Sequence, residues 1–327
     1  MVNSLGNLVL LPFQGQQIWD ATFCGRNLTM KSIFTQPYPT HNFLATYGGF
    51  LLHCGATAMG VPSQKDTHPL HGDLSNAIYN SATLVFGNDG KGEYIGLTGT
   101  YQHIIAFNCN YTATPLVKLY SSSSVFSVSM IIHNLRKIPM PLMVLEHVNF
   151  RPVNYSRLAQ TVFCDPDNMK VRLSVPEFMQ SPPGYIELLN KIKKEPELHL
   201  VIDPKYRYDP EIVIYLNYLA DKNGWAHTMQ IHPDGSADIL RHKPEQMNHG
   251  IRWLCRTSDY DAIGVEPATA QVDGYTAEKE KGNLRFLDGL SMFTFELEIG
   301  TLSPEEAIRE EELIKQVLSE KQDNRLN

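Results

Sequence analysis

The chain has 327 residues, of which 43% are hydrophobic and 19% are charged. This composition can fill a large buried core, and it excludes a chain too polar to fold. The net charge of −7 argues against a nucleic-acid-binding protein, which normally carries a basic face.

Most of the chain has the pattern of β-strands. Apolar side chains alternate over residues 126–132, which predicts a half-buried strand. Residues 142–148 follow a proline-rich breaker and are expected to form the neighbouring strand. Residues 233–236 predict a tight hairpin turn, since Gly235 can adopt a positive φ. Further strands are predicted at residues 199–202, 212–216, 227–231, 237–240 and 293–299.

Two segments are predicted to be helices. Residues 185–192 place apolar side chains at helical spacing, which indicates a short amphipathic helix. The C-terminal segment, about residues 303–322, begins with Ser303 as N-cap, Pro304 in the first turn and Glu306 to complete a capping box. We expect this helix to cover a sheet or to form an oligomer contact, for example in a homodimer. No linker interrupts the chain, so we predict one all-β sandwich domain over residues 1–327.

The cysteines, the N-terminal residues and the lengths of the apolar runs indicate in which compartment the protein works. The five cysteines are scattered and form no Cys-x-x-Cys pair, which argues against a disulfide framework and a structural zinc site. The first 13 residues carry no Lys or Arg before their apolar stretch, unlike a secretory signal. No apolar run approaches the roughly 20 residues that a membrane span needs. We therefore predict a soluble cytoplasmic protein without a membrane or nucleic-acid partner.

Three clusters place a titratable side chain beside an apolar run and a turn. The first comprises residues 48–55 (GGFLLHCG) together with residues 67–76 (THPLHGDLSN). The second comprises residues 141–150 (PLMVLEHVNF), and the third comprises residues 263–269 (IGVEPAT). Each cluster can direct one polar group from the surface of a sheet into a cleft.

Together these clusters resemble the aldose 1-epimerase (galactose mutarotase) superfamily, and in particular its aldose-epimerase-like DUF4432 subgroup. The resemblance runs from about Gly48 to Gly300. It rests on four motifs in the family's order: a double-Gly strand leading to Cys-Gly, a Leu-His-Gly loop, a His-x-Asn-Phe strand end and a Gly-x-Glu-Pro-x-Thr turn. It implies an all-β galactose mutarotase-like supersandwich of two large antiparallel sheets, with a sugar bound in a cleft on one face.

The resemblance also implies a chemistry. Interconversion of sugar anomers opens the hemiacetal ring and closes it on the other face of the carbonyl. One group protonates the ring oxygen, and another removes the proton of the anomeric hydroxyl. A histidine can be the acid near neutral pH and a carboxylate the base. Proton transfer alone forms the carbonyl, so we expect an isomerase of a small carbohydrate that needs no cofactor and no metal.

The family motifs indicate the residues for these roles. His147 matches the acid histidine, Glu266 is the expected cleft carboxylate, and His71 matches a second histidine that contacts the sugar near its ring oxygen. Asn149 lies two residues after His147, so both point to the same face of a strand, and Asn149 is an expected sugar contact. Each also has a structural interpretation, such as a core imidazole for His147 or a turn residue for His71.

Further candidates line the predicted cleft less directly. Asp73 stands where the subgroup often has an arginine, and His53 stands where a small hydroxyl residue is expected. Arg26 and Arg252 are the candidate cations, although a surface strand edge would explain Arg252 equally well. We predict all four as substrate-binding residues.

One departure from the family leaves the general base open. Mutarotases usually carry it in a Pro-Gly-Glu turn before the last strand, whereas residues 287–292 (LDGLSM) contain no glutamate. The base is then Glu266, Asp288 or another acid. If none of these serves, simple mutarotation is not the activity. The missing turn also supports an alternative, a non-catalytic carbohydrate-binding or regulatory protein that kept the cleft and lost the base.

A metal-dependent sugar isomerase or epimerase is the other alternative. It would draw its metal ligands from His53, His68, His71, His147, Asp66, Asp73 and Glu146. The sequence alone identifies neither the sugar nor the carbon at which it reacts.

Overall fold

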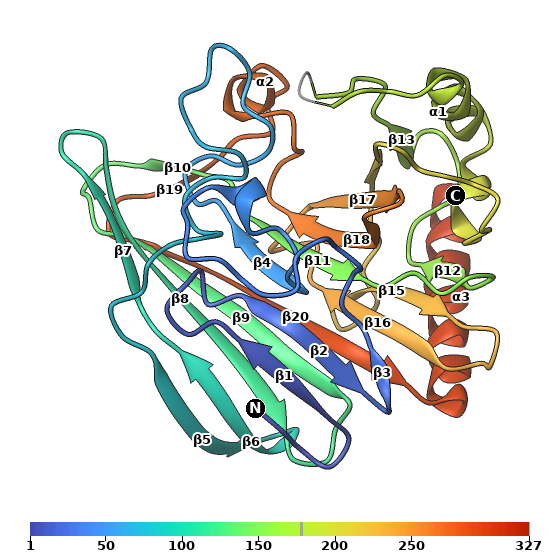
Figure 1. Ribbon diagram of the computed structural model, residues 1–327, viewed down its shortest axis with the longest axis horizontal. Helices are drawn as coiled ribbons and strands as arrows, with labels where there is room; N and C mark the ends of the chain where they lie inside the picture. Colours follow the sequence, from blue (N-terminus) through green and yellow to red (C-terminus); the bar gives the residue numbers. More distant parts are fainter. Residues whose placement is uncertain (177–178, 327) are drawn as a thin grey trace.

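Two large antiparallel sheets form the body of the protein (Figure 1). The computed structural model describes residues 1–176 and 179–326. We call the sheet that carries the candidate site the site sheet. Its strands are β1 (Gly6–Leu10), β2 (Ile18–Phe23), β3 (Arg26–Asn27), β4 (Leu51–Cys54), β11 (Leu145–Phe150), β13 (Met169–Val171), β14 (Ile212–Leu216), β17 (His249–Arg256) and β18 (Asp261–Ala268).

The second sheet, which we call the back sheet, lies behind it. Its strands are β5 (Thr83–Asp89), β6 (Gly92–Thr98), β7 (Tyr101–Ile105), β8 (Cys109–Tyr120), β9 (Val125–Asn134), β12 (Arg157–Gln160), β15 (Ala226–Ile231), β16 (Ala237–His242) and β20 (Met292–Leu302). A small two-stranded sheet of β10 (Met140–Leu142) and β19 (Arg285–Leu287) lies beside the large sheets. The α-helices are α1 (Tyr185–Lys194), α2 (Tyr275–Glu280) and α3 (Pro304–Leu326). Two short 3₁₀ helices are η1 (Phe43–Ala45) and η2 (Pro196–Leu200).

The core lies between the two sheets because alternate side chains of each strand point inward. Phe23 of β2 stacks on Phe126 of β9 with ring centroids 5.8 Å apart. Val128, Met130 and Ile132 are also fully buried, as the predicted alternation along β9 requires. The sandwich of antiparallel sheets with a few short helices and a C-terminal helix is therefore confirmed, whereas the single-domain assignment stays a prediction.

Two predictions about strands are wrong, one in its pairing and one in its secondary structure. Residues 142–148 do not pair with β9; β11 lies between β4 and β18 of the other sheet. The chain leaves the back sheet after β9 and breaks again at residues 143–144, where the amide of Val144 bonds to the hydroxyl of Thr269 at 2.8 Å. Residues 199–202 include the end of η2, which Pro196 begins and in which His199 bonds back to the Pro196 carbonyl.

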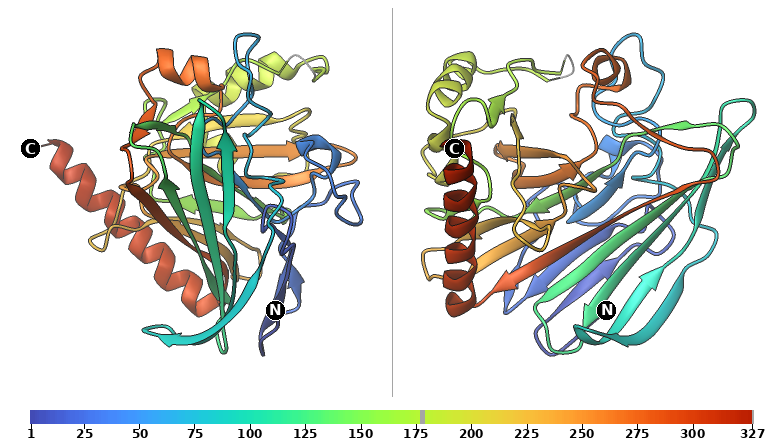
Figure 2. Two further views of the ribbon diagram at one scale, coloured as in Figure 1. Left: turned by 90° about the vertical axis from the view of Figure 1, so that its left-hand side faces the viewer. Right: turned by 180° about the vertical axis from the view of Figure 1, so that it is seen from behind.

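Helix α3 covers the outer face of the back sheet (Figure 2). The predicted capping box is confirmed: the amide of Glu306 donates to the Ser303 hydroxyl at 3.3 Å, and the amide of Ser303 donates to the Glu306 carboxylate at 2.8 Å. Ile314 is buried against the sheet, and Arg241 of β16 holds Glu310 by two hydrogen bonds. The helix thus covers a sheet, while a homodimer stays a prediction. In residues 1–176 and 179–326, no helix is both long enough and apolar enough to cross a membrane.

Candidate active site

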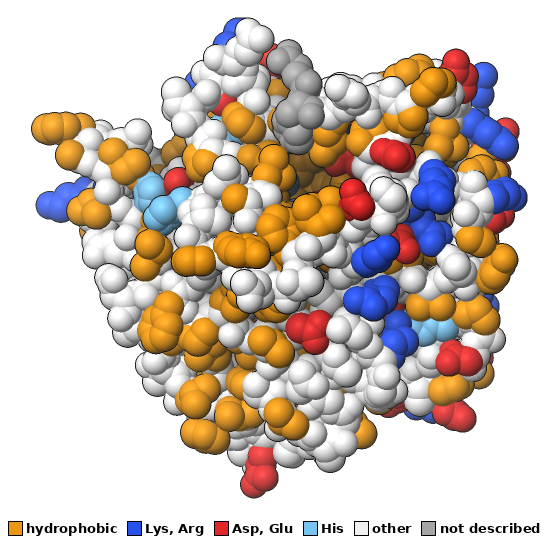
Figure 3. Space-filling view, in the orientation of Figure 1, with side chains coloured by type: hydrophobic (Ala, Val, Ile, Leu, Met, Phe, Trp, Pro, Cys, Tyr) orange, Lys and Arg blue, Asp and Glu red, His pale blue; other side chains and the backbone are white. Residues whose placement is uncertain are grey.

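A cavity opens on the face of the site sheet that points away from the back sheet (Figure 3). Strands β11, β14, β17 and β18 form its floor. Their side chains alternate between the cavity and the inter-sheet core: Val213 and Trp253 line the cavity, whereas Ile214 and Leu254 are buried in the core. Loops before β4, after β4 and after β13 form its walls.

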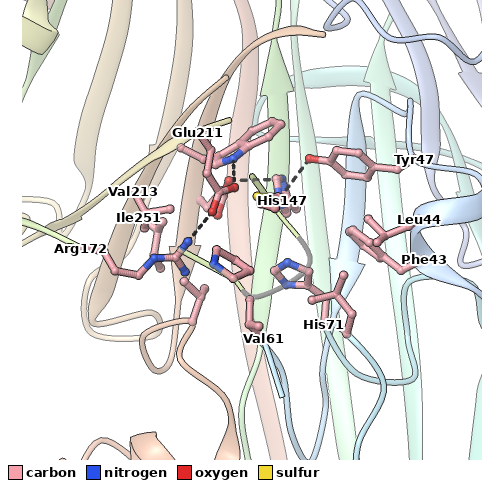
Figure 4. Close-up of a pocket in the computed structure, with 16 residues that line it drawn as sticks. Phe43, Leu44, Tyr47, Val61, His71, His147, Arg172, Glu211, Val213 and Ile251 are labelled. Atoms are coloured by element: carbon pink, nitrogen blue, oxygen red, sulfur yellow. Dashed lines mark hydrogen bonds and ion pairs between the residues drawn. The ribbon is translucent and has the colours of Figure 1, made fainter. Parts of the chain in front are cut away.

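Three residues indicated by the sequence meet in this cavity (Figure 4). His147 of β11 and Glu266 of β18 lie side by side because Leu145 faces Ala268 and Val148 faces Val265 in the strand register. The Nδ1 atom of His147 lies 3.3 Å from Oε1 of Glu266. His71, from the Leu-His-Gly loop, places its ring centroid 5.4 Å from that of His147.

Tyr47, which is part of the cavity wall, connects His147 to Asn149. The Tyr47 hydroxyl lies 3.2 Å from Nε2 of His147 and donates to Oδ1 of Asn149 at 3.4 Å. The amide nitrogen of Asn149 donates to the carbonyl of Gly49 at 3.1 Å. Asn149 is fully buried and does not line the cavity, so the structure corrects its expected role as a direct sugar contact.

The cavity holds a second carboxylate that sequence reasoning missed. Glu211 lies just before β14, forms an ion pair with Arg172 and accepts a hydrogen bond of 2.7 Å from the indole nitrogen of Trp253. The only sequence signal was an acid directly before a predicted strand, at Asp209-Pro210-Glu211. Sequence reasoning also missed Arg172 and Tyr47, because they belong to no family motif and come from distant segments of the chain.

Burial shifts the pKa of the Glu266 carboxyl group upward and the pKa values of the two imidazoles downward. Burial, and then the nearby Glu211 carboxylate, raises the pKa of Glu266 well above its usual value. Burial lowers the pKa of His147 well below its usual value and lowers that of His71 to about 3. At neutral pH we therefore infer a protonated Glu266 and two neutral imidazoles, beside the ion pair of Glu211 with Arg172. Carboxyl groups whose environments differ in this way are typical of acid–base sites.

Four buried polar atoms around the cavity have no hydrogen-bond partner within the described residues. They are His71 Nδ1, His147 Nδ1, Glu266 Oε1 and Arg172 Nε. Although His147 Nδ1 and Glu266 Oε1 are close, their orientation does not form a hydrogen bond. Buried polar atoms are nearly always satisfied in proteins. A cavity where several remain unsatisfied is therefore suited to a polar ligand such as a polyol.

Two candidates lie on the opposite face of the site sheet. His53 pairs with Glu146 at 2.7 Å in the inter-sheet core, where both side chains are fully buried. Arg252 is also fully buried and donates to Gln160 at 2.7 Å. Arg252 lies between Ile251 and Trp253, which line the cavity, and His53 faces Glu146, the residue before the cavity-lining His147. A shift of one residue reverses the face in a strand. Neither side chain can reach a ligand in this cavity.

The remaining candidates lie elsewhere on the molecule. Arg26 forms an ion pair with Asp238 of the back sheet and so links the two sheets. Asp73 follows the Leu-His-Gly loop but turns to His103, with 3.6 Å between Oδ2 and Nε2, in a separate hollow. Asp288 is exposed in the turn before β20, so it does not supply the base in this cavity.

The histidines of the metal alternative are not gathered at one point. His53 is in the core, His68 is in an exposed loop where it accepts a bond from the Tyr275 amide at 3.3 Å, and only His71 and His147 share the cavity. Among the described residues, no group of three or more His, Cys, Asp or Glu side chains is arranged to hold a metal ion.

Comparisons with known proteins agree with this fold. Residues 3–153 match the family model described as "Domain of unknown function (DUF4432)". A proposed aldose 1-epimerase from Klebsiella pneumoniae subsp. pneumoniae MGH 78578 is 15% identical, with a TM-score of 0.81 over 95% of this chain and 80% of that one. The chain has the galactose mutarotase-like fold. The predicted resemblance to DUF4432 and to galactose mutarotase-like proteins is confirmed.

Two further structures are similar at lower TM-scores. A proposed aldose 1-epimerase from Escherichia coli K12 is 14% identical, with a TM-score of 0.61 over 92% of this chain and 97% of that one. A galactose mutarotase-like protein from Lactobacillus casei ATCC 334 is 12% identical, with a TM-score of 0.58 over 92% and 99%. The comparison with curated proteins found no match. The DUF4432 match includes His71 and His147, whereas Glu211 and Glu266 lie beyond it.

Proposed function

We propose that this protein is an aldose 1-epimerase-like isomerase that opens and closes the ring of a free sugar by acid–base catalysis. One observation carries the proposal: His147 and Glu266 lie 3.3 Å apart on the floor of the cavity, each with an unpartnered buried atom among the described residues. The proposed aldose 1-epimerases with the same fold support an isomerase. Phe43 and Trp253 supply apolar walls against which the face of a sugar ring can pack.

The two groups can act as a bifunctional pair. Glu266 gives its proton to the ring oxygen while His147 Nδ1 accepts the proton of the anomeric hydroxyl. The bond between the anomeric carbon and the ring oxygen breaks, and a carbonyl forms. The pair is left as a carboxylate beside an imidazolium. After the carbonyl rotates, the reverse transfers close the ring as the other anomer and restore both groups.

These roles are the reverse of those expected from the sequence, where His147 was the acid and Glu266 the base. Burial favours the neutral form of both groups, and the neutral forms are a carboxylic acid and an unprotonated imidazole nitrogen. The reaction converts this neutral pair into an ion pair. The ion pair of Glu211 and Arg172 lies in the same cavity. Its charges are already in place, so they provide a polar environment for the developing ion pair without rearrangement.

The charges around the cavity favour an uncharged sugar. Arg172 is the cation among the described lining residues, and it is already paired with Glu211 and lies 3.9 Å from Asp273. Both imidazoles in the cavity are neutral at pH 7 on the argument above. A phosphate or carboxylate on the substrate would meet the Glu211 charge without a free cation. We therefore propose a free aldose or ketose rather than a sugar phosphate.

An NMR panel of free aldoses and ketoses in D2O tests the proposal. We expect faster exchange between the anomers of at least one sugar, without deuterium at carbon, because no C–H bond is broken. His147→Ala should abolish this acceleration while the protein stays folded and still binds the sugar weakly. A near wild-type rate in this variant would contradict the assignment. Sugar binding without any acceleration would instead favour a non-catalytic carbohydrate-binding protein.

A further inference from the structure

A buried chain of polar groups leads from the backbone to His147. It begins at the carbonyl of Gly49 and continues through the amide of Asn149 and the hydroxyl of Tyr47 to Nε2 of His147. Its heavy-atom distances are 3.1, 3.4 and 3.2 Å. The three side chains of Asn149, Tyr47 and His147 are buried, with exposed fractions of 0%, 8% and 5%.

The first link fixes the direction of the others. A carbonyl oxygen can only accept, so the nitrogen of the Asn149 amide must face Gly49, and its oxygen must face Tyr47. The single hydroxyl proton of Tyr47 then points to Asn149, and the hydroxyl oxygen is left as an acceptor toward His147. In a neutral imidazole one nitrogen carries the proton and the other accepts. The proton of His147 is therefore on Nε2.

The opposite tautomer would break this chain. If Tyr47 donated to Nε2 of His147, the amide oxygen of Asn149 would lose its donor in a fully buried place. Leaving a buried acceptor unsatisfied is unfavourable. The Nδ1 proton would then point at Glu266, where it would occupy the atom that must receive the substrate proton.

We propose that Tyr47 and Asn149 are positioning residues that hold His147 as the Nε2–H tautomer and so keep Nδ1 free to accept a proton from the sugar. This inference rests on the proposed function for its catalytic consequence. The position of Tyr47 is itself fixed by ring contacts, with centroid distances of 4.9 Å to Phe43 and 5.9 Å to Trp253. Burial raises the pKa of Tyr47 well above its usual value, so its hydroxyl keeps its proton.

The tautomer can be measured without a substrate. In protein labelled with ¹⁵N-histidine, the two ring nitrogens of His147 differ in chemical shift according to which one carries the proton. His147 is one of 12 histidines, and its signals are assigned by their loss in His147→Ala. We expect the Nε2–H form in the wild type and a substantial population of the Nδ1–H form in Tyr47→Phe.

Tyr208→Phe is the matched control. Tyr208 is 1% exposed, and its hydroxyl has no hydrogen-bond partner in the described part of the chain. The control therefore removes a buried tyrosine hydroxyl without touching the polar chain. We expect it to leave the His147 signals unchanged, together with kcat and KM.

Kinetics supply the second measurement. Tyr47→Phe should lower kcat by about tenfold, the effect of losing one ordinary hydrogen bond, with little change in KM. Asn149→Ala should lower kcat similarly. The double variant should lose less than the product of the two single losses, because Asn149, Tyr47 and His147 belong to one hydrogen-bond network.

The outcomes separate this inference from the proposed function. An unchanged Nε2–H tautomer in Tyr47→Phe overturns the inference, and so does an Nδ1–H tautomer in the wild type. Independent, multiplicative losses in the double variant also overturn it. A tautomer change in a protein that accelerates no sugar supports the role of Tyr47 in holding His147, while it contradicts the proposed function.

Discussion

Replacing Glu266 with glutamine should remove activity and stabilise the fold at neutral pH. The Glu266 side chain is 3% exposed, and its Oε1 has no partner within the described residues. Burial and the nearby Glu211 raise its pKa well above the usual value, because a second negative charge there is unfavourable. Glutamine has the same shape and stays uncharged at every pH. It cannot transfer a proton, so we expect a rate loss of about 10²- to 10⁴-fold.

The sign of the stability change follows from proton linkage. In the unfolded chain a glutamate loses its proton near pH 4.3, whereas the folded protein keeps the Glu266 proton to higher pH. The stability associated with this proton is fully present below the unfolded pKa and is lost as pH rises to the folded pKa. Over that interval wild-type stability falls by up to about 1.4 kcal/mol per pH unit relative to Glu266→Gln.

Urea unfolding at pH 5, 6, 7 and 8 measures this difference, and polarimetry of a pure anomer measures the rate. Glu312→Gln, an exposed position on α3, is the matched control and should change neither. A free-energy difference between Glu266→Gln and wild type that does not grow with pH would refute the reasoning. It would mean that Glu266 is ionised in the folded protein.

Three further predictions follow from the same structure. The rate should be flat across neutral pH, because burial lowers the pKa of His147 and raises that of Glu266; a limb near pH 6.5 in the rate profile would contradict this. Glu211→Gln removes the nearer of the two acids that pair with Arg172, so calorimetry should show tighter binding of a uronate relative to the neutral sugar, and an unchanged preference would argue against a charge-balanced cavity. Ile314→Ala, at a side chain 2% exposed under α3, should lower the free energy of unfolding by about 2 to 5 kcal/mol without changing the rate. If denaturant unfolding shows that Ile314→Ala lowers the free energy of unfolding by less than about 1 kcal/mol, this helix packs loosely on the sheet.

Regular patterns were sufficient to predict much of the fold. The alternation in β9 and β20 and the capping box of α3 are local signals, and the structure agrees with them. The order of the family motifs also indicated His71, His147 and Glu266, which the structure brings into one cavity. These residues could be found because each belongs to a short motif next to an apolar strand.

Other features depend on contacts that no local pattern records. Tyr47 and His147 are 100 residues apart, and Glu211 and Arg172 belong to no motif. His53 shows how sensitive such predictions are to strand register, because one residue separates the cavity face from the core face. Residues 142–148 were assigned to the wrong sheet, since adjacency in sequence does not determine which sheet an interrupted strand joins.

Saturation transfer between the anomeric protons of a free sugar tests the central claim most directly. A catalytic amount of wild-type protein should carry saturation from one anomer to the other. Glu266→Gln and His147→Ala, each folded by circular dichroism, should not. Transfer at the wild-type rate in either variant would contradict the claim that these two side chains together open the ring.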